Sequence, residues 1–200
     1  LIIIYDADGV EVSEGRRPLQ ARLYYARLTQ ALVTAVTAPM TEGRLYKVDM
    51  RLRPSGNQGP VATSWQAFTN YQETQAWIWE HLAMSRAGIV AGNTSLSLDV
   101  EAFRISLMGR KDTQAVKMAL AQMRLRIART KGMGEAWDIK DGAGRLQDIE
   151  LISQLGRLLC GGAQRDVLSG LKGCVGSGVL NDAERTEIAA AYRLLWSLRV

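Results

Sequence analysis

Acidic and basic residues alternate with apolar ones between Leu45 and Arg53, at the period of a β-strand with one buried face. On the charged face, the carboxylate of Asp49 falls between Lys47 and Arg51. Neighbouring cations keep a carboxylate ionised, and Mg²⁺ is usually held by one or two carboxylates together with substrate phosphates, which arginine also binds. The spacing therefore suits a Mg²⁺ and phosphate site. Taken alone, it favours a solvated strand face with cross-strand ion pairs.

A second candidate opens the chain, where an apolar run leads into Asp6-Ala7-Asp8-Gly9. This run is similar to the nucleophile motif of haloacid-dehalogenase-type phosphatases, in which the first aspartate attacks phosphorus and the second serves as acid and base. Val10 stands where that motif usually has threonine, and the sequence contains no convincing second half of the motif. We therefore favour an acidic turn that follows a strand.

A third candidate begins at Lys140, where a glycine-containing turn precedes a predicted helix that carries Asp148 and Glu150 near its start. Backbone N–H groups at a helix N-terminus can hold an anion, and a nearby lysine adds a positive charge. The two acids can equally well complement the helix dipole. Both interpretations stay open. His81 is the one histidine, so a histidine-based metal cluster is not expected.

Periodicity and capping signals predict the elements that carry these groups. We expect strands at 1–5, 45–53 and 88–92, and helices at about 18–38, 64–86, 116–127 and 146–155 and after an Asn181–Glu184 capping box. The pattern becomes almost wholly helical after residue 95, which predicts a domain boundary near residue 93. Because the first residues already read as a buried strand, we also expect the chain to be a piece of a longer protein.

The composition limits the classes of partner. The 25 Lys and Arg against 20 Asp and Glu leave a net charge of +5, which indicates an anionic partner such as nucleotide phosphates or an acidic protein surface. The sequence has no apolar run of the roughly 20 residues that span a bilayer and no recognised nucleic-acid module, so neither a membrane nor a nucleic acid is expected as partner. Cys160 and Cys174 form no disulfide framework, which favours a reduced, cytoplasmic compartment.

Taken together, these segments resemble the glutamine synthetase adenylyltransferase family. The resemblance lies in Gly43–Gly56 (GRLYKVDMRLRPSG), in Tyr71-Gln72 with Trp79-Glu80-His81, in Ser85-Arg86-Ala87, and in Lys140-x-Gly142-x-Gly144 leading into Asp148-Ile149-Glu150. The first of these runs is the most specific, and the last 40 or so residues match loosely. Two residues depart from the pattern: Arg145 replaces a glycine and Leu151 a phenylalanine.

The resemblance implies a fold and a reaction. The family is bifunctional, with one nucleotidyltransferase half that adenylylates a tyrosine of glutamine synthetase and a related half that removes the group. The motifs here look more like the adenylylating half. The implied fold is α+β, with a polymerase-β-like nucleotidyltransferase mixed sheet and helices over 1–93 and a helical bundle over 94–200. The implied reaction uses ATP and releases pyrophosphate, and it regulates nitrogen metabolism in the cytoplasm of bacteria.

The resemblance also implies roles for residues. In the family, a Gly-Ser-Asp-x-Asp motif precedes the strand that begins here at Leu1, and its two aspartates bind two Mg²⁺ ions together with a third, which by position is Asp49. Arg51 and Arg53 are expected to stabilise phosphate charge. Because the first two aspartates are not part of this sequence, we expect the chain by itself to be weakly active or inactive.

Further residues are expected near the nucleotide. Arg86 and Lys140 are expected to bind its phosphates, while Asp148 and Glu150 are expected at the mouth of the active site or, equally, in a structural role at a helix start. Glutamine synthetase is the expected partner, with a PII signal-transduction protein as a second one. Three alternatives stay open: the deadenylylating half, which uses phosphate as attacking group, a non-catalytic docking fragment, and the dehalogenase-type phosphatase.

Overall fold

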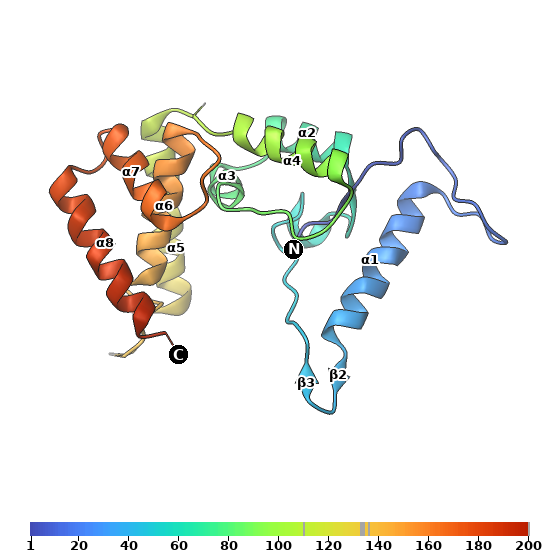
Figure 1. Cartoon of the computed structure of the whole chain (residues 1–200), viewed down its shortest axis with the longest axis horizontal. Coiled ribbons are helices and arrows are strands. Elements are labelled where there is room, and N and C mark those ends of the chain that lie inside the picture. Colours follow the sequence, from blue (N-terminus) through green and yellow to red (C-terminus); the bar gives the residue numbers. More distant parts are fainter. Residues whose placement is uncertain (110, 133–134, 136, 200) are drawn as a thin grey trace. The chain divides into compact units, whose positions relative to one another are not determined.

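The computed structural model describes residues 1–109, 111–132, 135 and 137–199. Within it the chain forms two compact units, Leu1–Ala76 and Trp77–Val200, which we describe separately. The change of domain predicted near residue 93 differs from this division and stays a prediction. The fold of the described residues is dominated by helices with small sheets, as Figure 1 shows.

The first unit combines two helices with very short strands. Its elements are β1 (Ile4–Tyr5), α1 (Ala21–Thr37), β2 (Pro39–Met40), β3 (Gly43–Arg44), the 3₁₀ turn η1 (Gly56–Gln58), β4 (Thr63–Ser64) and α2 (Trp65–Thr74). Strand β1 pairs in parallel with β4, with Ile4 opposite Thr63, and β2 pairs antiparallel with β3. The parallel pair joins the start of the chain to the segment that leads into α2.

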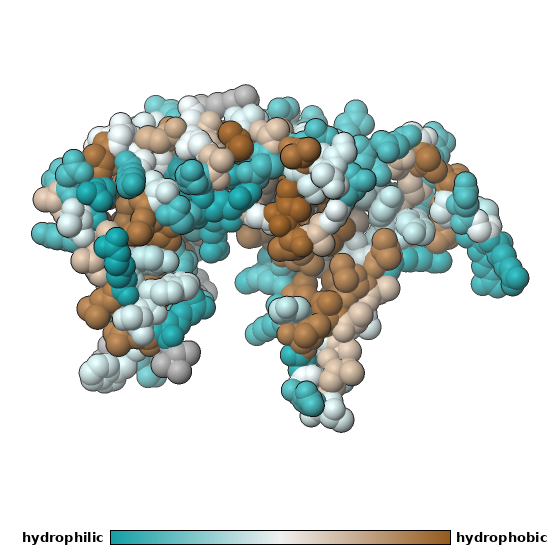
Figure 2. Space-filling view, viewed as in Figure 1, coloured by the Kyte–Doolittle hydropathy of each residue, from teal (hydrophilic) through white to brown (hydrophobic). Residues whose placement is uncertain are grey.

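Helix α1 confirms the prediction at 18–38, and its end has a local cause. Ala38, the residue between the helix and Pro39, is extended with ψ 135°, because the residue before a proline is disfavoured in helical conformation. Helix α2 begins where expected, and its N-cap is Ser64, whose hydroxyl accepts the N–H of Ala67 at 3.3 Å. Large apolar side chains stay exposed along α1, among them Leu28, and Figure 2 shows brown surface over this helix.

The predicted strand at 45–53 is wrong: only Gly43–Arg44 is extended in a ladder, and the residues after it are irregular. Local hydrogen bonds explain the difference. The Asp49 carboxylate accepts the N–H of Arg51 at 2.9 Å, and the N–H of Arg53 donates to the Met50 carbonyl at 3.2 Å. Such bonds compete with a strand ladder. In the described residues the strands form two separate pairs, so the larger mixed sheet that we expected is not formed there.

The helix predicted over 64–86 is two helices, α2 and α3 (Ile78–Met84). Trp77 between them is extended, with φ −76° and ψ 155°, and its N–H donates to the Glu80 carboxylate at 3.1 Å, which starts α3 anew. The strand predicted at 88–92 is also wrong, since these residues are irregular. A short strand has little stability without a neighbouring strand to pair with.

The second unit is a group of helices around one apolar core. After α3 come α4 (Thr94–Ser106), α5 (Thr113–Lys131), α6 (Leu146–Cys160), α7 (Val167–Gly176) and α8 (Asp182–Ser197). Its core contains Leu82, Leu107, Met108, Val116, Leu155, Leu158 and Cys174. The capping box predicted at α8 is confirmed, because Asn181 and Glu184 each accept the backbone N–H of the other, at 2.9 and 2.8 Å.

Helices α6 and α7 pack so closely that the contact depends on glycine. A Cβ atom added at Gly170 would lie 2.2 Å from Ser153 Oγ and 2.3 Å from the Ser153 carbonyl oxygen. At Gly156 it would lie 2.0 Å from the carbonyl oxygen of Gly170. Real side chains do not approach backbone atoms this closely, so these positions exclude any larger residue without moving a helix. None of the described helices is both long and apolar enough to span a membrane.

Candidate functional site

Asp49 and Arg51 form an exposed pair in the first unit. Arg51 Nε lies 3.0 and 2.9 Å from the two carboxylate oxygens of Asp49, and Nη2 lies 2.6 Å from Oδ2. The two side chains are 56% and 76% exposed, in that order, so a ligand can reach both. The hydrogen bonds from the Arg51 side chain, with its backbone N–H, lower the pKa of Asp49 to about 2. The carboxylate is therefore ionised at neutral pH.

Arg53 is two residues further on and has a different environment. Its guanidinium donates to three backbone carbonyls: Nη1 to Met50 at 3.1 Å, Nη2 to Asn57 at 3.3 Å and Nε to Gly59 at 3.3 Å. The side chain thus braces the turn that follows Asp49. The strand pattern in the sequence gave no sign of these acceptors, since it placed Arg53 beside Asp49 on one charged face.

Arg86 and Glu150 come together in the second unit. Arg86 follows the end of α3, and its Nη1 lies 3.8 Å from a carboxylate oxygen of Glu150 in the first turns of α6. The Arg86 side chain is 55% exposed and that of Glu150 33% exposed. The pair is long and accessible, so an anion could compete with Glu150 for the Arg86 guanidinium.

Lys140 and Asp148 also lie in the second unit, close to the start of α6. Lys140 is exposed, and its backbone N–H donates to the Asp138 carboxylate at 2.8 Å. Asp148 accepts the N–H of Gly144 at 2.9 Å and forms an ion pair with Arg124 of α5. Asp148 therefore ties the turn before α6 to a neighbouring helix.

Arg145, which departs from the family pattern, has a structural role that sequence reasoning missed. Its Nη1 donates to the carbonyls of Glu135 at 2.8 Å, Asp141 at 2.7 Å and Asp138. These acceptors lie four to ten residues earlier in the chain, so no local spacing rule points to them. The guanidinium holds the loop that presents Lys140, which a glycine at position 145 could not do.

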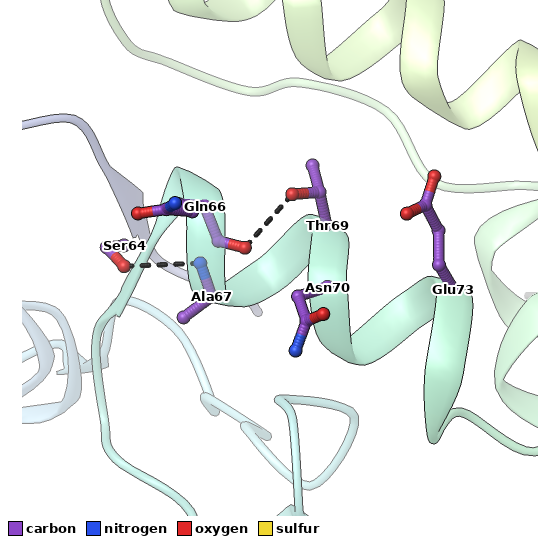
Figure 3. A pocket seen from close by; sticks show the side chains of 6 residues that line it. All are labelled: Ser64, Gln66, Ala67, Thr69, Asn70 and Glu73. Atoms are coloured by element: carbon purple, nitrogen blue, oxygen red, sulfur yellow. Dashed lines mark hydrogen bonds between the residues drawn. The ribbon is translucent and has the colours of Figure 1, made fainter.

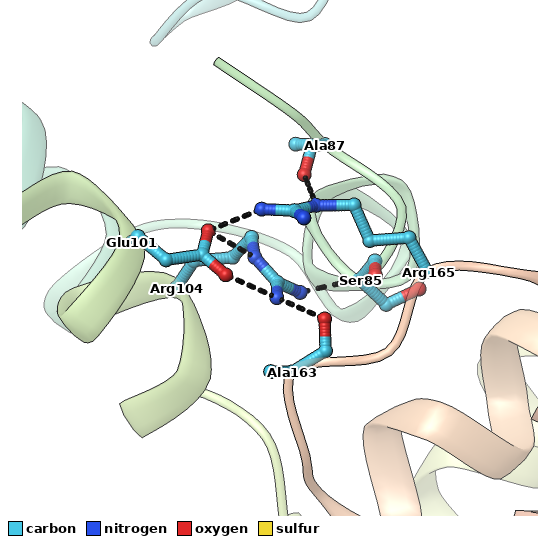
Figure 4. A network of polar contacts seen from close by, with 6 residues as sticks. All are labelled: Ser85, Ala87, Glu101, Arg104, Ala163 and Arg165. Atoms are coloured by element: carbon cyan, nitrogen blue, oxygen red, sulfur yellow. Dashed lines mark hydrogen bonds and ion pairs between the residues drawn. The ribbon is translucent and has the colours of Figure 1, made fainter. Parts of the chain in front are cut away.

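Figure 4 shows a network around a buried arginine that the sequence also did not reveal. Arg104, only 2% exposed, donates to both carboxylate oxygens of Glu101, at 2.8 and 2.9 Å, and to the carbonyls of Ser85 and Ala163 at 3.2 and 2.8 Å. Arg165 binds the same carboxylate at 2.5 Å and the Ala87 carbonyl at 2.6 Å. The network joins α4 to the segments on both sides of Arg86 and before α7.

No complete metal site accompanies these residues in the described part of the chain. No group of three or more His, Cys, Asp or Glu side chains there is placed to hold a metal ion. Asp49 alone, with both oxygens bound by Arg51, does not amount to a Mg²⁺ site. A shallow polar pocket of about 410 Å³ lies along α2, and Figure 3 shows the side chains around it. It is lined by Ser64, Gln66, Ala67, Thr69, Asn70 and Glu73.

Comparison with known proteins decides the family. Residues 1–102, just over half of the chain, match the family model described as glutamate-ammonia ligase adenylyltransferase. The chain belongs to this family. This confirms the resemblance found in the sequence. Residues 112–200 match a second family model, described as GlnD PII-uridylyltransferase.

Curated relatives of the adenylyltransferase family resemble the chain along most of its length. A bifunctional glutamine synthetase adenylyltransferase/adenylyl-removing enzyme from Mesorhizobium japonicum is 41% identical over 99% of this chain. Its counterpart from Rhizobium meliloti is also 41% identical over 99% of the chain, and that from Agrobacterium fabrum is 45% identical over 77%. The chain spans about a fifth of the length of such relatives, 21% for the Mesorhizobium enzyme.

Proposed function

We propose that this chain takes part in transferring the adenylyl group of ATP to a tyrosine hydroxyl of glutamine synthetase, as part of the adenylylating half of a bifunctional enzyme. Support comes from the family match over residues 1–102 and from the names of the relatives. The observation that carries the proposal is the exposed, ionised carboxylate of Asp49, held by Arg51 within the run that most resembles the family.

The low pKa of Asp49 selects among the roles that a carboxylate can have. In the reaction, the tyrosine oxygen bonds to the α-phosphorus, pyrophosphate leaves, and the hydroxyl proton must be accepted. A carboxylate with a pKa of about 2 is a weak base for that proton, whereas it remains fully charged to hold a cation. We therefore assign Asp49 to cation binding, together with the aspartates that the family motif places before Leu1. The described residues of this chain do not by themselves provide that set.

The arginines and Lys140 receive supporting roles in this proposal. Arg51 presents a forked guanidinium that suits phosphate oxygens, and its side chain is 76% exposed. Arg86 and Lys140 are exposed cations of the second unit that can bind nucleotide phosphates. For Asp148 we favour the structural alternative, because it already binds Arg124 and the Gly144 N–H. Glu150 keeps Arg86 in place until an anion arrives.

The test uses an exchange enzyme, in which this chain replaces the matching fifth of the Mesorhizobium enzyme. We expect the exchange enzyme to transfer label from ATP marked at its α-phosphate to glutamine synthetase. Asp49→Asn should reduce this transfer by about a hundredfold or more, since it removes the charge and leaves the size unchanged. Asp6→Asn is the matched control: the same change at another exposed aspartate should have little effect, whereas a phosphatase reaction would depend on it.

Other outcomes distinguish the alternatives. If Asp49→Asn abolishes phosphate-dependent removal of label from adenylylated glutamine synthetase and leaves label addition intact, the chain belongs to the deadenylylating half. If neither reaction changes in a folded exchange enzyme, the chain is a docking module. The match of residues 112–200 to a PII-uridylyltransferase model makes a PII protein the second partner to test for binding.

A further inference from the structure

The turn that follows Asp49 is braced by a single side chain. We call Pro54–Gly59 the 54–59 loop. Arg53 directly before it donates to the Asn57 and Gly59 carbonyls inside the loop and to the Met50 carbonyl next to Asp49. One guanidinium therefore couples the loop to the residue adjoining the candidate catalytic carboxylate. A lysine carries the same charge but cannot present three forked donors.

The loop is held in one conformation by its backbone as well. Ser55 has φ +60°, the left-handed region that non-glycine residues seldom adopt. A Cβ atom on Gly59 would lie 1.8 Å from the Pro54 carbonyl oxygen, so the two ends of the loop touch. Pro54 itself is buried. An exposed loop kept in a strained and closely packed shape is ordered before it meets any ligand, which favours specific binding.

The groups that the loop presents are neutral. Ser55, Asn57 and Gln58 are exposed, and their side chains make no hydrogen bond to any described residue. The neighbouring cation, Arg53, donates its hydrogen bonds to backbone carbonyls. The loop N–H groups of Gly56, Gln58 and Gly59 are used internally, on the carbonyls of Arg53, Ser55 and Gly56 at 2.8, 3.2 and 3.2 Å.

This chemistry separates two classes of ligand. A phosphate needs free cations or free backbone N–H groups, and in the loop Arg53 and the N–H groups of Gly56, Gln58 and Gly59 are bound to the chain's own carbonyls. Carboxamide and hydroxyl side chains, which both donate and accept, suit the alternating N–H and C=O groups of a polypeptide. The loop therefore fits a protein better than ATP.

We propose that the 54–59 loop binds the polypeptide of the protein acceptor beside its tyrosine, and that Arg53 is a positioning residue that acts through this loop. The inference rests on the proposed function, which supplies glutamine synthetase as the acceptor. It changes the role of Arg53 from binding phosphate to presenting Asn57 and Gln58 to the acceptor. The loop begins five residues after Asp49 in the sequence, so we expect the tyrosine of an acceptor bound there to come near that carboxylate.

Binding of the full 200-residue chain to immobilised, unmodified glutamine synthetase tests the loop without requiring catalysis. The double variant Asn57→Ala/Gln58→Ala removes two exposed amides and should raise Kd about tenfold. The matched control, Gln66→Ala/Asn70→Ala, removes the same two kinds of side chain from exposed positions on α2 of the same unit and should change Kd by less than about twofold. Binding of ATP to the loop variant should stay as in the native chain.

Three results would overturn the inference: no binding by the native chain, equal loss in the loop variant and the α2 control, or weakened ATP binding in the loop variant. Because these measurements need no turnover, they stand even if the exchange enzyme transfers no label, which would defeat only the proposed function.

Arg53→Lys in the exchange enzyme separates positioning from phosphate binding. The positioning role predicts a KM for glutamine synthetase raised about tenfold, with kcat and the KM for ATP nearly unchanged. A phosphate role would instead lower kcat, because charge develops on the phosphate oxygens in the transition state. Circular dichroism of each variant checks that the chain is folded, and Asn57→Ala/Gln58→Ala provides the same KM test without altering any group that braces the loop.

Discussion

The two compact units are ordered by different forces. In the described part of the first unit, the buried apolar residues are Pro54, Ala62 and Phe68, and arginine side chains bound to backbone carbonyls or carboxylates shape the segment around Asp49. The second unit buries leucines from three of its segments in one core, with Leu82, Leu107, Leu155 and Leu158 all at 4% exposure or less.

This difference matters because the two kinds of order have different strengths. A buried leucine contributes roughly 1.5–3 kcal/mol, whereas a hydrogen bond contributes about 1 kcal/mol net. The strongest candidate for chemistry, Asp49, thus lies where local polar contacts set the geometry, and the helices of the second unit supply a packed core. We expect changes in the second unit to alter stability most, and changes near Asp49 to alter titration and binding.

The largest effect is expected from Gly170→Ala at the contact between α6 and α7. The new methyl group would overlap Ser153 Oγ and the Ser153 carbonyl oxygen, so the helices must separate. We expect a loss of about 3 kcal/mol in the free energy of unfolding, measured by urea denaturation. Hydrogen exchange read by mass spectrometry should show faster exchange in α6 and α7 and no change in residues 1–76.

Gly176→Ala is the control for this prediction. Gly176 is in the same helix, and a Cβ there would meet only Cys160 Sγ at 3.4 Å. We expect a change within about 0.5 kcal/mol. Equal losses in the two variants would show that close packing of α6 on α7 is not what makes glycine necessary at 170.

A smaller effect is expected from Arg104→Gln, which breaks the network in Figure 4. Its loss leaves the Ser85 and Ala163 carbonyls without their donor, but Glu101 keeps Arg165 as a partner. We therefore expect about 2 kcal/mol of destabilisation, below the cost of leaving a buried charge unpaired.

The pH dependence checks the same network. Hydrogen bonds from Arg104 lower the pKa of Glu101, so their stabilisation is present above the ordinary carboxyl pKa and is lost as the pH falls through the lowered one. Arg104→Gln should reduce the acid sensitivity of unfolding in this range. If the acid sensitivity of unfolding stays unchanged in this variant, Arg104 does not lower the pKa of Glu101.

The smallest effect on stability is expected near Asp49. A substitution there should instead change the pKa of the Asp49 carboxyl group. Nuclear magnetic resonance should show its carboxyl titrating at about pH 2, below its ordinary value of 3.8. Arg51→Gln should move the titration back toward 3.8, because it removes the guanidinium that donates to both oxygens. A native Asp49 that titrates near 3.8 would mean that Arg51 does not hold the carboxylate in solution.

Several features of the fold could be read from the sequence because their causes are local. The end of α1 at Pro39, the Asn181–Glu184 capping box and the helical run of α5 each depend on residues within one or two turns. The Gly43–Gly56 run likewise identified the family, which the match over residues 1–102 confirmed. The cations next to Asp49 in the sequence marked it as a candidate site residue, and in the structure Arg51 binds its carboxylate.

Other features could not be predicted from the sequence. In some, the interacting groups are far apart in the chain, and in others one group has two possible hydrogen-bond partners and can bind only one of them. The alternation over 45–53 predicted a strand, but strands need a pairing edge, and the Asp49 carboxylate bonded the Arg51 N–H instead. Trp77 and Glu80 divided a continuous helical pattern into α2 and α3. Nothing in the spacing of Arg104 showed that it would be buried among Glu101 and carbonyls 19 and 59 residues away.

The sequence by itself determined the family, the caps and the charges available for chemistry, because these follow from residue types at short spacing. Only the tertiary structure decided what each charge binds. Arg51 binds the Asp49 carboxylate, which stays exposed and ionised. The guanidinium groups of Arg53, Arg104 and Arg145 instead donate hydrogen bonds to backbone carbonyls. A guanidinium carries the same charge in all four places, and the backbone around it determines whether any donor remains for a ligand.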